Sequence, residues 1–597
     1  MSIIPGVAVQ FEYSYNITYS DNKAKFRVFR GRAFLEVTNL MYKGVVLMYK
    51  GVVRFVIMAA TVGVYCPMPS RAQDAPPAMA SLAHPVDHCA ELAALSLDHV
   101  ELTAATSEGS EAAPAGTPGS LAARMAALPG FCRITGRMHP EAGSDIGVEV
   151  WMPLANWDGR LHGAGNGGFA GYVSYADLGA AVRAGAVGVA TDTGHYAAMI
   201  DASWAKAHPE RIRDYGWRAI HLSALLAKQL IVKMYGRPAD HAYFMACSGG
   251  GRQGLVEAER FPDDYDGIVA SAPASIFTDM ALTMINTVQA QTAPGAAIRS
   301  NQVPFLQAEV LRQCDALDGQ MDGLVADPRQ CHLDVSKLEC ATSDSPQCFT
   351  PPQVEALRKI YAGPRNSSGR QLAPAFPASG GEHGTAGSSG WELWVLGDGK
   401  RRPNQSFLPD GILANFIAEP FASTDTFDFD KDTARLRALL APDIDAKPDL
   451  TRFFKRGGKL IMWHGWADPA IAPQLSINFH ESILRASGYR AKGSVRLFMV
   501  PGVQHCFGGP GPNMFGQIVA PMPGASPESS LGAAIHAWVE SGLAPDKIIA
   551  HTGSITEFAG APPNGPEENR RLICAYPARA TLRSNGDTTN VLSYQCL

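Results

Sequence analysis

Short runs of apolar and β-branched residues, each bounded by Gly, Pro or Asp, recur through the first half of the chain and predict buried strands. They occupy residues 146–154, 185–192, 241–247 and 265–273. Residues 214–236 instead carry apolar side chains at spacings of three and four, the period of a helix with one buried face. Strands that alternate with helices predict an α/β domain with a mostly parallel sheet.

This pattern stops within residues 274–450, which are rich in Cys, Pro, Gly and Ser. Two further strand-like runs follow, at residues 458–468 and 494–506. We therefore predict that residues 73–273 and 451–597 form the α/β domain, and that the segment between them is a domain inserted between two strands. An insertion of this size is expected to act as a lid over the site.

Charge and composition indicate a globular protein that acts on a small molecule. The 51 Lys and Arg residues nearly balance the 56 Asp and Glu residues, so the formal net charge is only -5. Such a chain has no basic field to hold nucleic acid or an anionic membrane. We expect a small substrate that is uncharged or weakly charged.

Residues 1–72, the leader, have the features of a secretory signal peptide over residues 48–72. It contains Lys50 and Arg54, then an apolar run over residues 55–66, then small residues before the expected cleavage site. A membrane anchor is the alternative, but the apolar run is too short to span a bilayer as a helix. We therefore predict a secreted or periplasmic protein, and assign no role to residues 1–47.

Cysteine usage agrees with export. The chain has 11 cysteines, and removal of the leader with Cys66 leaves an even number, which suggests five disulfides. Sequence alone does not determine the pairing. Local spacing favours Cys314 with Cys331, Cys340 with Cys348, Cys574 with Cys596, and Cys89 with Cys132, which leaves Cys247 and Cys506 as partners.

The stretch "FMACSGGGRQGL" combines a strand, a sharp turn that carries Ser248, and a helix predicted to begin at about Arg252. This is the context of a nucleophile elbow, in which a strained turn raises the serine hydroxyl above the sheet. The motif usually has Gly two residues before the serine, where this chain has Ala246. A plain glycine-rich turn is the alternative.

The other parts of a catalytic triad follow in the order expected of an α/β-hydrolase, which is Ser, Asp, His. Asp468 comes just after one predicted strand, and His505 lies in the loop after the next. In this hypothesis His505 accepts the proton of Ser248, and Asp468 orients the imidazole and stabilises its cation. His464 and His195 also follow strands, but for each we favour a role in a loop or in support of the residues of the site.

A disulfide between Cys247 and Cys506 would bring the adjacent Ser248 and His505 within reach of one another, because disulfides hold their Cα atoms about 4.4–6.8 Å apart. The competing hypothesis makes Cys247 the nucleophile with His505 as its base. It requires a free thiol, and the even number of cysteines in the mature chain argues against it.

An ester carbonyl also needs an oxyanion hole. The N–H of Gly249 is one expected donor, and the loop "GRLHGAGNGGFAGY" is the natural source of the second. We choose Gly168 there, with Gly167 as the alternative. The same loop matches G-x-G-x-x-G, but no helix-forming run opens on its last glycine, so a dinucleotide site is disfavoured.

The inserted segment contains a candidate calcium loop, "CDALDGQMDGLVADPRQC". Asp315, Asp318 and Asp322 repel one another unless a hard cation lies among them, and Ca²⁺ accepts carboxylate and carbonyl oxygens. Backbone oxygens of Gln320 and Leu324 are expected to complete the shell. Asp-Gly turns on a solvated surface are the alternative.

These motifs together resemble the tannase and feruloyl esterase family of α/β-hydrolases. The resemblance rests on "CSGGGRQG", "HGWAD", "PGVQHC" and the Asp-rich loop, and it extends from about Cys89 to Cys596. It implies an exported serine esterase with the triad, the oxyanion donors and the structural Ca²⁺ site named above. It also implies that Trp394 packs on the aromatic acid of the substrate, with packing inside the lid as the alternative.

We therefore expect hydrolysis of esters of hydroxylated aromatic acids, most of all feruloyl esters, through an acyl-serine intermediate. Galloyl esters, as in a tannase, are the alternative. Members that hydrolyse terephthalate half-esters carry an acidic residue after the serine, where this chain has Gly249, so that specialisation is disfavoured. A hypothesis of a different class is a catalytically silent binding protein that keeps the fold.

Overall fold

The computed structural model describes three short segments near the N-terminus and most of residues 85–597. Between residues 85 and 597, the structure does not describe residues 108–121, 123, 124, 126, 342–344, 385–389, 397–402, 418–420, 422, 554–568, 585 and 589. The chain divides into two compact units, Met1–Ser81 and Leu82–Leu597. The first contains an antiparallel sheet of three strands, β1 (Tyr15–Ser20), β2 (Lys23–Val28) and β3 (Phe34–Thr38). The predicted signal peptide lies outside the described residues.

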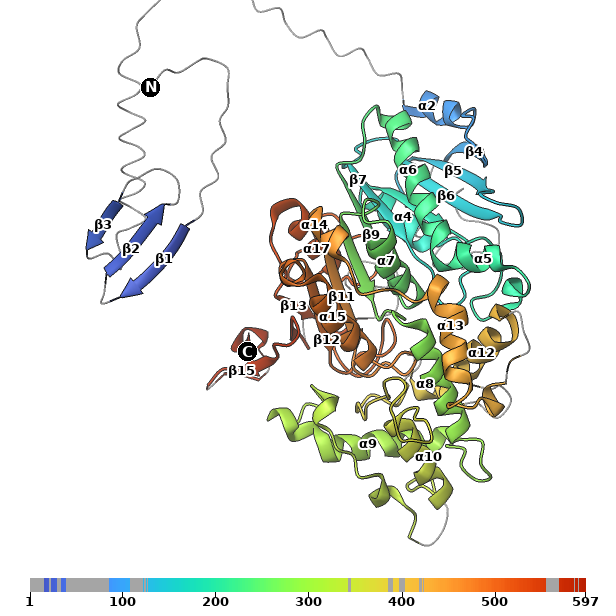
Figure 1. The fold of residues 1–597 in the computed structure, drawn as a ribbon, viewed down its shortest axis with the longest axis vertical. Helices are drawn as coiled ribbons and strands as arrows, with labels where there is room; N and C mark the ends of the chain where they lie inside the picture. The colour runs from blue at the N-terminus through green and yellow to red at the C-terminus, as the bar shows by residue number, and fades with distance from the viewer. Residues whose placement is uncertain are drawn as a thin grey trace, which may run out of the picture. The chain divides into compact units, whose positions relative to one another are not determined.

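The second unit is built on a nine-stranded sheet in the order β12-β11-β10-β9-β7-β8-β6-β5-β4 (Figure 1). Neighbouring strands pair in parallel from β12 to β8, and β8, β6, β5 and β4 pair antiparallel. The predicted α/β-hydrolase fold with a mostly parallel sheet is therefore confirmed. The strands are β4 (Val100–Ser107), β5 (Phe131–Met138), β6 (Ile146–Pro153), β7 (Arg160–Ala164), β8 (Val187–Thr191), β9 (His241–Cys247), β10 (Gly267–Ser271), β11 (Lys459–Gly465) and β12 (Val495–Val500).

Both faces of the central strands are apolar because helices cover both faces. Successive side chains of a strand point to opposite sides. Phe244, Ile268 and Leu460 lie in one core with α6 (Ala219–Tyr235), α7 (Gly249–Arg260) and α15 (Gln474–Ser487). Their neighbours Met245 and Val269 lie in another core with α17 (Leu531–Ser541). Strands buried on both sides read as continuous apolar runs, which is why the sequence pattern was clear.

The residues between β10 and β11 form helices, and those described contribute no strand to the nine-stranded sheet. The main ones are α8 (Phe277–Ala290), α9 (Val303–Cys314), α10 (Pro351–Ala362), α11 (Trp391–Trp394), α12 (Asn404–Gly411) and α13 (Asp432–Ile444). Leu282 and Ile412 of this segment share a core with Phe169 and Trp204 of the sheet domain. The segment thus packs directly on the loops that follow β7 and β8.

Helix α7 begins at Gly249, three residues before the predicted start at Arg252. Poor helix propensity of the three glycines suggested the later start. Packing decides otherwise, because a Cβ on Gly251 would lie 2.5 Å from the carbonyl oxygen of Ser271. Glycine is required here so that the first turn of the helix can approach the neighbouring strand.

The end of the chain forms two small antiparallel pairs, β13 (Lys547–Ala550) with β14 (Arg571–Cys574) and β15 (Ala580–Leu582) with β16 (Tyr594–Cys596). A disulfide joins Cys574 to Cys596. Among the described residues, no helix has the length and apolar character needed to cross a membrane.

Candidate active site

Ser248 lies on a strained turn between β9 and α7. Its φ of 64° is in the left-handed region that non-glycine residues rarely adopt. The Ser248 N–H donates to the carbonyl oxygen of Ser271 at 2.9 Å, which ties the turn to β10. This geometry is that of a nucleophile elbow, in which the turn directs the hydroxyl away from the sheet edge.

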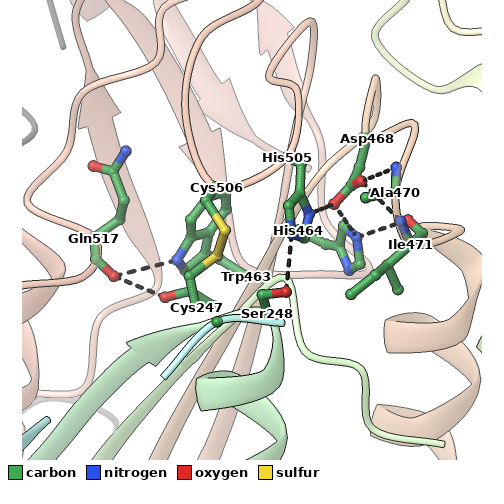
Figure 2. Close-up of a disulfide and its surroundings, with 12 residues drawn as sticks. Cys247, Ser248, Trp463, His464, Asp468, Ala470, Ile471, His505, Cys506 and Gln517 are labelled. Carbon is green, nitrogen blue, oxygen red and sulfur yellow. Dashed lines mark hydrogen bonds and ion pairs between the residues drawn. A yellow bond between two sulfur atoms is a disulfide. The ribbon is translucent and has the colours of Figure 1, made fainter. Parts of the chain in front are cut away.

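Three side chains from separate loops form a continuous hydrogen-bonded chain (Figure 2). The Nε2 atom of His505 lies 3.0 Å from the Oγ of Ser248, and its Nδ1 lies 2.7 Å from the Oδ2 of Asp468. Each residue follows the carboxyl end of a parallel strand, so the sheet brings together positions 220 and 37 residues apart. The predicted Ser248, Asp468 and His505 are therefore adjacent and correctly ordered for proton transfer.

The carboxylate of Asp468 accepts four hydrogen bonds. The backbone N–H groups of Ala470 and Ile471 donate to Oδ1 at 2.8 and 2.9 Å, while His505 and His464 contact Oδ2 at 2.7 and 3.0 Å. Burial by itself would raise the pKa of Asp468, but the two histidines outweigh it and the pKa is held well below its usual value. Asp468 is therefore ionised and fixed in orientation.

His464 is a component of this site whose contact with Asp468 the sequence did not reveal. Its Nε2 faces two acceptors, Asp468 Oδ2 and the Ile471 carbonyl oxygen at 3.1 Å, so this nitrogen carries a proton. Its Nδ1 lies 2.7 Å from the hydroxyl of Ser476. The spacing of His464 and Asp468 across the end of one strand was the available signal, but histidines after strands are common in loops.

All five predicted disulfides are present, and one of them joins the loops that carry Ser248 and His505. Cys247 and Cys506 are bonded with their Cα atoms 6.0 Å apart, beside Ser248 and His505 (Figure 2). The loop after His505 is held further by Gln517, whose carbonyl oxygen accepts from the Ser271 hydroxyl at 2.8 Å. The others join Cys89 to Cys132, Cys314 to Cys331, Cys340 to Cys348, and Cys574 to Cys596.

Ala246, at the position where the elbow motif usually has glycine, is accommodated by glycines elsewhere. A Cβ built on Gly250 or on Gly165 would approach the methyl group of Ala246 to 2.5 or 2.7 Å. These two glycines therefore leave the space that the methyl group occupies. The turn at Ser248 keeps its elbow conformation despite the departure from the motif.

The loop after β7 lies against the first turn of α7. A Cβ on Gly249 would lie 3.7 Å from the nitrogen of Gly168, so the two backbones are adjacent. The Gly167 N–H donates to the hydroxyl of Tyr172 at 3.1 Å. Neither the Gly168 nor the Gly249 N–H has a hydrogen-bond acceptor among the described residues, as expected of donors kept for a ligand. This arrangement favours Gly168 over Gly167.

Trp394, at the end of α11, lies next to the histidine of the site. The rings of Trp394 and His505 meet edge to face with centroids 5.3 Å apart. The indole Nε1 is buried and has no hydrogen-bond partner among the described residues. Gln504 also joins this segment to the loop of His505, because its amide donates to the Gly381 carbonyl oxygen at 2.8 Å.

The candidate calcium loop follows α9. The Oδ1 of Asp315 is buried without a hydrogen-bond partner among the described residues. Burial raises the pKa of Asp318, and the charges of Asp322 and Asp315 add to the increase. A buried oxygen without a donor and mutually repelling carboxylates fit a hard cation. Arg571 supplies part of the balancing charge, since its Nη1 lies 2.6 Å from Asp322 Oδ2.

Comparison with known proteins agrees with this geometry. Residues 132–597 match the family described as "Tannase and feruloyl esterase". An uncharacterised esterase from Xanthomonas campestris pv. campestris is 36% identical over 546 residues, covering 85% of this chain and 91% of the relative. The mono(2-hydroxyethyl) terephthalate hydrolase of Piscinibacter sakaiensis is 30% identical over 539 residues, covering 79% and 86%.

Solved structures give the same relationship. Feruloyl esterase B from Aspergillus oryzae superimposes with a TM-score of 0.75 and 25% identity, covering 86% of this chain and 100% of that one. The tannin acyl hydrolase of Aspergillus niger superimposes with a TM-score of 0.63 at 22% identity, which shows the shared fold alone.

Proposed function

Because the chain belongs to the tannase and feruloyl esterase family and is a carboxylic ester hydrolase, we propose that it cleaves esters of hydroxylated aromatic acids through an acyl-Ser248 intermediate. The observation that carries this proposal is the hydrogen-bonded chain from Ser248 through His505 to Asp468. It ends at a serine hydroxyl beside two backbone N–H groups that have no acceptor among the described residues.

In the proposed acylation step, Ser248 Oγ bonds to the ester carbonyl carbon while its proton passes to His505 Nε2. Gly168 and Gly249 donate their N–H groups to the oxygen that becomes negative. Asp468 stabilises the imidazolium without itself taking the proton. Collapse of the intermediate breaks the bond to the alcohol, which leaves with the proton from His505. Water then attacks the acyl-enzyme in the same way and releases the acid.

The preference for an aromatic acid is supported by Trp394. Its ring lies against His505, on the side of the site formed by the helical segment between β10 and β11. A flat, apolar wall beside the base favours an aromatic ring over a flexible alkyl chain. Relatives include a probable feruloyl esterase B-2 of Aspergillus flavus, 32% identical over 458 residues. We therefore place hydroxycinnamoyl esters first and galloyl esters second.

The test is a parallel measurement of kcat/KM on methyl ferulate, methyl gallate and methyl butyrate. We expect the ferulate ester to be favoured, and Trp394→Leu to reduce kcat/KM for both aromatic esters while the butyrate ester changes little. Trp394→Phe is the matched control, because it keeps an aromatic wall. Equal losses on all three esters would assign Trp394 to packing and leave the aromatic preference without support.

We also propose that residues 274–450 act as a lid held by Ca²⁺, and that the protein is exported. Asp315, Asp318 and Asp322 would supply carboxylate ligands, and Gln320 and Leu324 would supply backbone oxygens. The ion would order this loop and take no part in ester cleavage. Export is supported by five disulfides, which persist in oxidising compartments.

A further inference from the structure

A second cluster of ligand-type side chains lies at the end of α7 that is remote from Ser248. Glu257 belongs to α7, His221 to the start of α6, and Asp264 to the loop before β10. One ligand atom from each lies within 4.8 Å of the other two, and no other group of three or more His, Cys, Asp or Glu in the described chain meets this spacing. Nine residues of helix, roughly 13 Å, separate Glu257 from Ser248.

Glu257 has no hydrogen-bond donor, although it is almost completely buried. Its side chain is 1% exposed, and neither carboxylate oxygen has a partner among the described residues. A buried carboxylate without a donor is costly, so this group requires either a proton or a cation.

The surrounding side chains hold the cluster in place and leave Glu257 unsatisfied. The imidazole of His221 stacks on Phe261 with centroids 3.7 Å apart, and its Nδ1 lies 2.6 Å from Asp264 Oδ2. The ammonium group of Lys228 donates to the Asp263 carbonyl oxygen and remains 3.9 Å from Asp264 Oδ1. Lys228 therefore makes only a long ion pair with Asp264 and gives no hydrogen bond to Glu257.

We propose that His221, Glu257 and Asp264 bind a divalent transition-metal ion of the Zn²⁺ type, which braces α6, α7 and the loop before β10. One imidazole nitrogen with two carboxylate oxygens suits Zn²⁺ or Co²⁺, whereas Ca²⁺ prefers a shell of oxygens alone. Two negative charges balance a divalent ion. The His221 side chain is 22% exposed, which gives the ion a route from solvent.

The test measures metal binding directly on the full chain, stripped with a chelator and then kept in excess Ca²⁺ so that the lid loop is filled. We expect about one equivalent of Zn²⁺ per chain by equilibrium dialysis, with a rise in Tm of roughly 3 °C at saturation. Co²⁺ should give visible absorption bands of a low-coordinate site, a signature that needs no variant. His221→Gln and Glu257→Gln should each weaken binding by at least about tenfold.

Asp263→Asn is the matched control, since this neighbouring carboxylate is 83% exposed and lies outside the cluster, so its binding should match the wild type. The competing explanation is a proton shared between Glu257 and Asp264. In that case wild-type protein binds no Zn²⁺ under these conditions, and Glu257→Gln keeps or raises Tm because an amide replaces a protonated carboxyl. Either of these results would overturn the proposal.

Discussion

Two loops of this protein place carboxylates in opposite situations, since Asp468 is buried and Asp318 lies in a more exposed loop. Asp468, in the loop after β11, accepts four hydrogen bonds and its pKa is lowered. Asp318, in the loop after α9, has a raised pKa, and the neighbouring Asp315 has an oxygen without a partner in the described chain. Both oxygens of Asp468 thus have hydrogen-bond donors from the protein, whereas Asp315 in the loop of Asp318 keeps one oxygen without a donor among the described residues.

This difference predicts that the loop of Asp468 contributes to ester cleavage and that the loop of Asp318 contributes to stability. A carboxylate that orients a catalytic base must keep its charge and position without help from a mobile ion, so fixed donors surround it. Each aspartate of the Asp-rich loop accepts a backbone N–H, yet the Oδ1 of Asp315 has no partner among the described residues. We propose that a cation completes this loop by binding its folded form alone, which stabilises that fold by linkage. Changes in the first loop should therefore affect turnover, and changes in the second should affect stability.

The sharpest test of this contrast is removal of the catalytic groups. Ser248→Ala should lower kcat by about 10⁴-fold or more, and Asp468→Asn by about 10³- to 10⁴-fold, since the latter loses the orientation and charge that support His505. Both variants should keep the wild-type Tm within a few degrees. Initial rates on methyl ferulate check this, and an Ser248→Ala variant that retains wild-type turnover would remove the serine from the mechanism.

Removal of the disulfide between Cys247 and Cys506 should lower both turnover and stability. Cys247→Ser with Cys506→Ser should lower kcat roughly 100-fold, because displacements near 1 Å between reacting groups have effects of this size. It should also cost about 2–5 kcal/mol of the free energy of unfolding. The control is Cys340→Ser with Cys348→Ser, which opens a loop of separation 8 and should leave kcat unchanged.

The unmodified protein should contain no thiol that reacts under denaturing conditions once the leader is removed. A single reactive thiol at Cys247 in active enzyme would support the cysteine nucleophile instead.

Substitutions of His464 test whether its hydrogen bond to Asp468 supports turnover. His464→Phe removes one donor to the charged Asp468, a contact worth about 1.5–3 kcal/mol, so kcat should fall roughly 10- to 100-fold at constant KM. His464→Gln keeps a donor and should recover part of the loss. Both variants leave Ser476 without its imidazole partner. Equal losses in kcat for the two, matched by equal losses in Tm, would mean that His464 only fills space.

Calcium removal should act on stability first. Chelation should lower Tm by roughly 3 °C or more, the shift expected when an ion at 100 times its Kd contributes about 2.7 kcal/mol. Turnover at low temperature should be unchanged. Asp318→Asn should reproduce the loss and abolish the response to added Ca²⁺. Immediate loss of turnover on chelation, at constant Tm, would make the ion catalytic and contradict the contrast between the two loops.

The pH dependence of stability should have opposite signs in the two loops, although it is the smallest effect. Asp468 has a lowered pKa, so its contribution to stability is present above its usual value of 3.8 and is lost as pH falls. Asp318 has a raised pKa, so the metal-free loop is most stable when this group is protonated, below 3.8, and that contribution is lost as pH rises.

The rise in Tm produced by Ca²⁺ should therefore grow as pH increases above 3.8, because the ion no longer competes with a proton on Asp318. Thermal melts with and without Ca²⁺ across this range measure it. If Ca²⁺ raised the Tm by the same amount at every pH, Asp318 would not be a ligand.

Much of the fold was predictable because burial on both sides leaves a simple pattern. The strands that end beside Ser248, Asp468 and His505 are mostly apolar, and turn residues follow each of them. The start of α7 was not predictable, since propensity places it after three glycines and packing places it at the first. The contact of His464 with Asp468 was equally hidden, because one histidine at the end of strand β11 carries no signal about its partners.

The chain order of Ser, Asp and His, and the even number of cysteines that restricts their pairing, can be read from the residues alone. These are local or countable properties, which survive without coordinates. Three other features became visible in the folded chain: Gly165 and Gly250 make room for Ala246, Gly168 and not Gly167 keeps its N–H available, and Trp394 lies against His505. Each of these depends on distances between residues far apart in the chain, and such distances are set only when the strands pair and the helices pack on them.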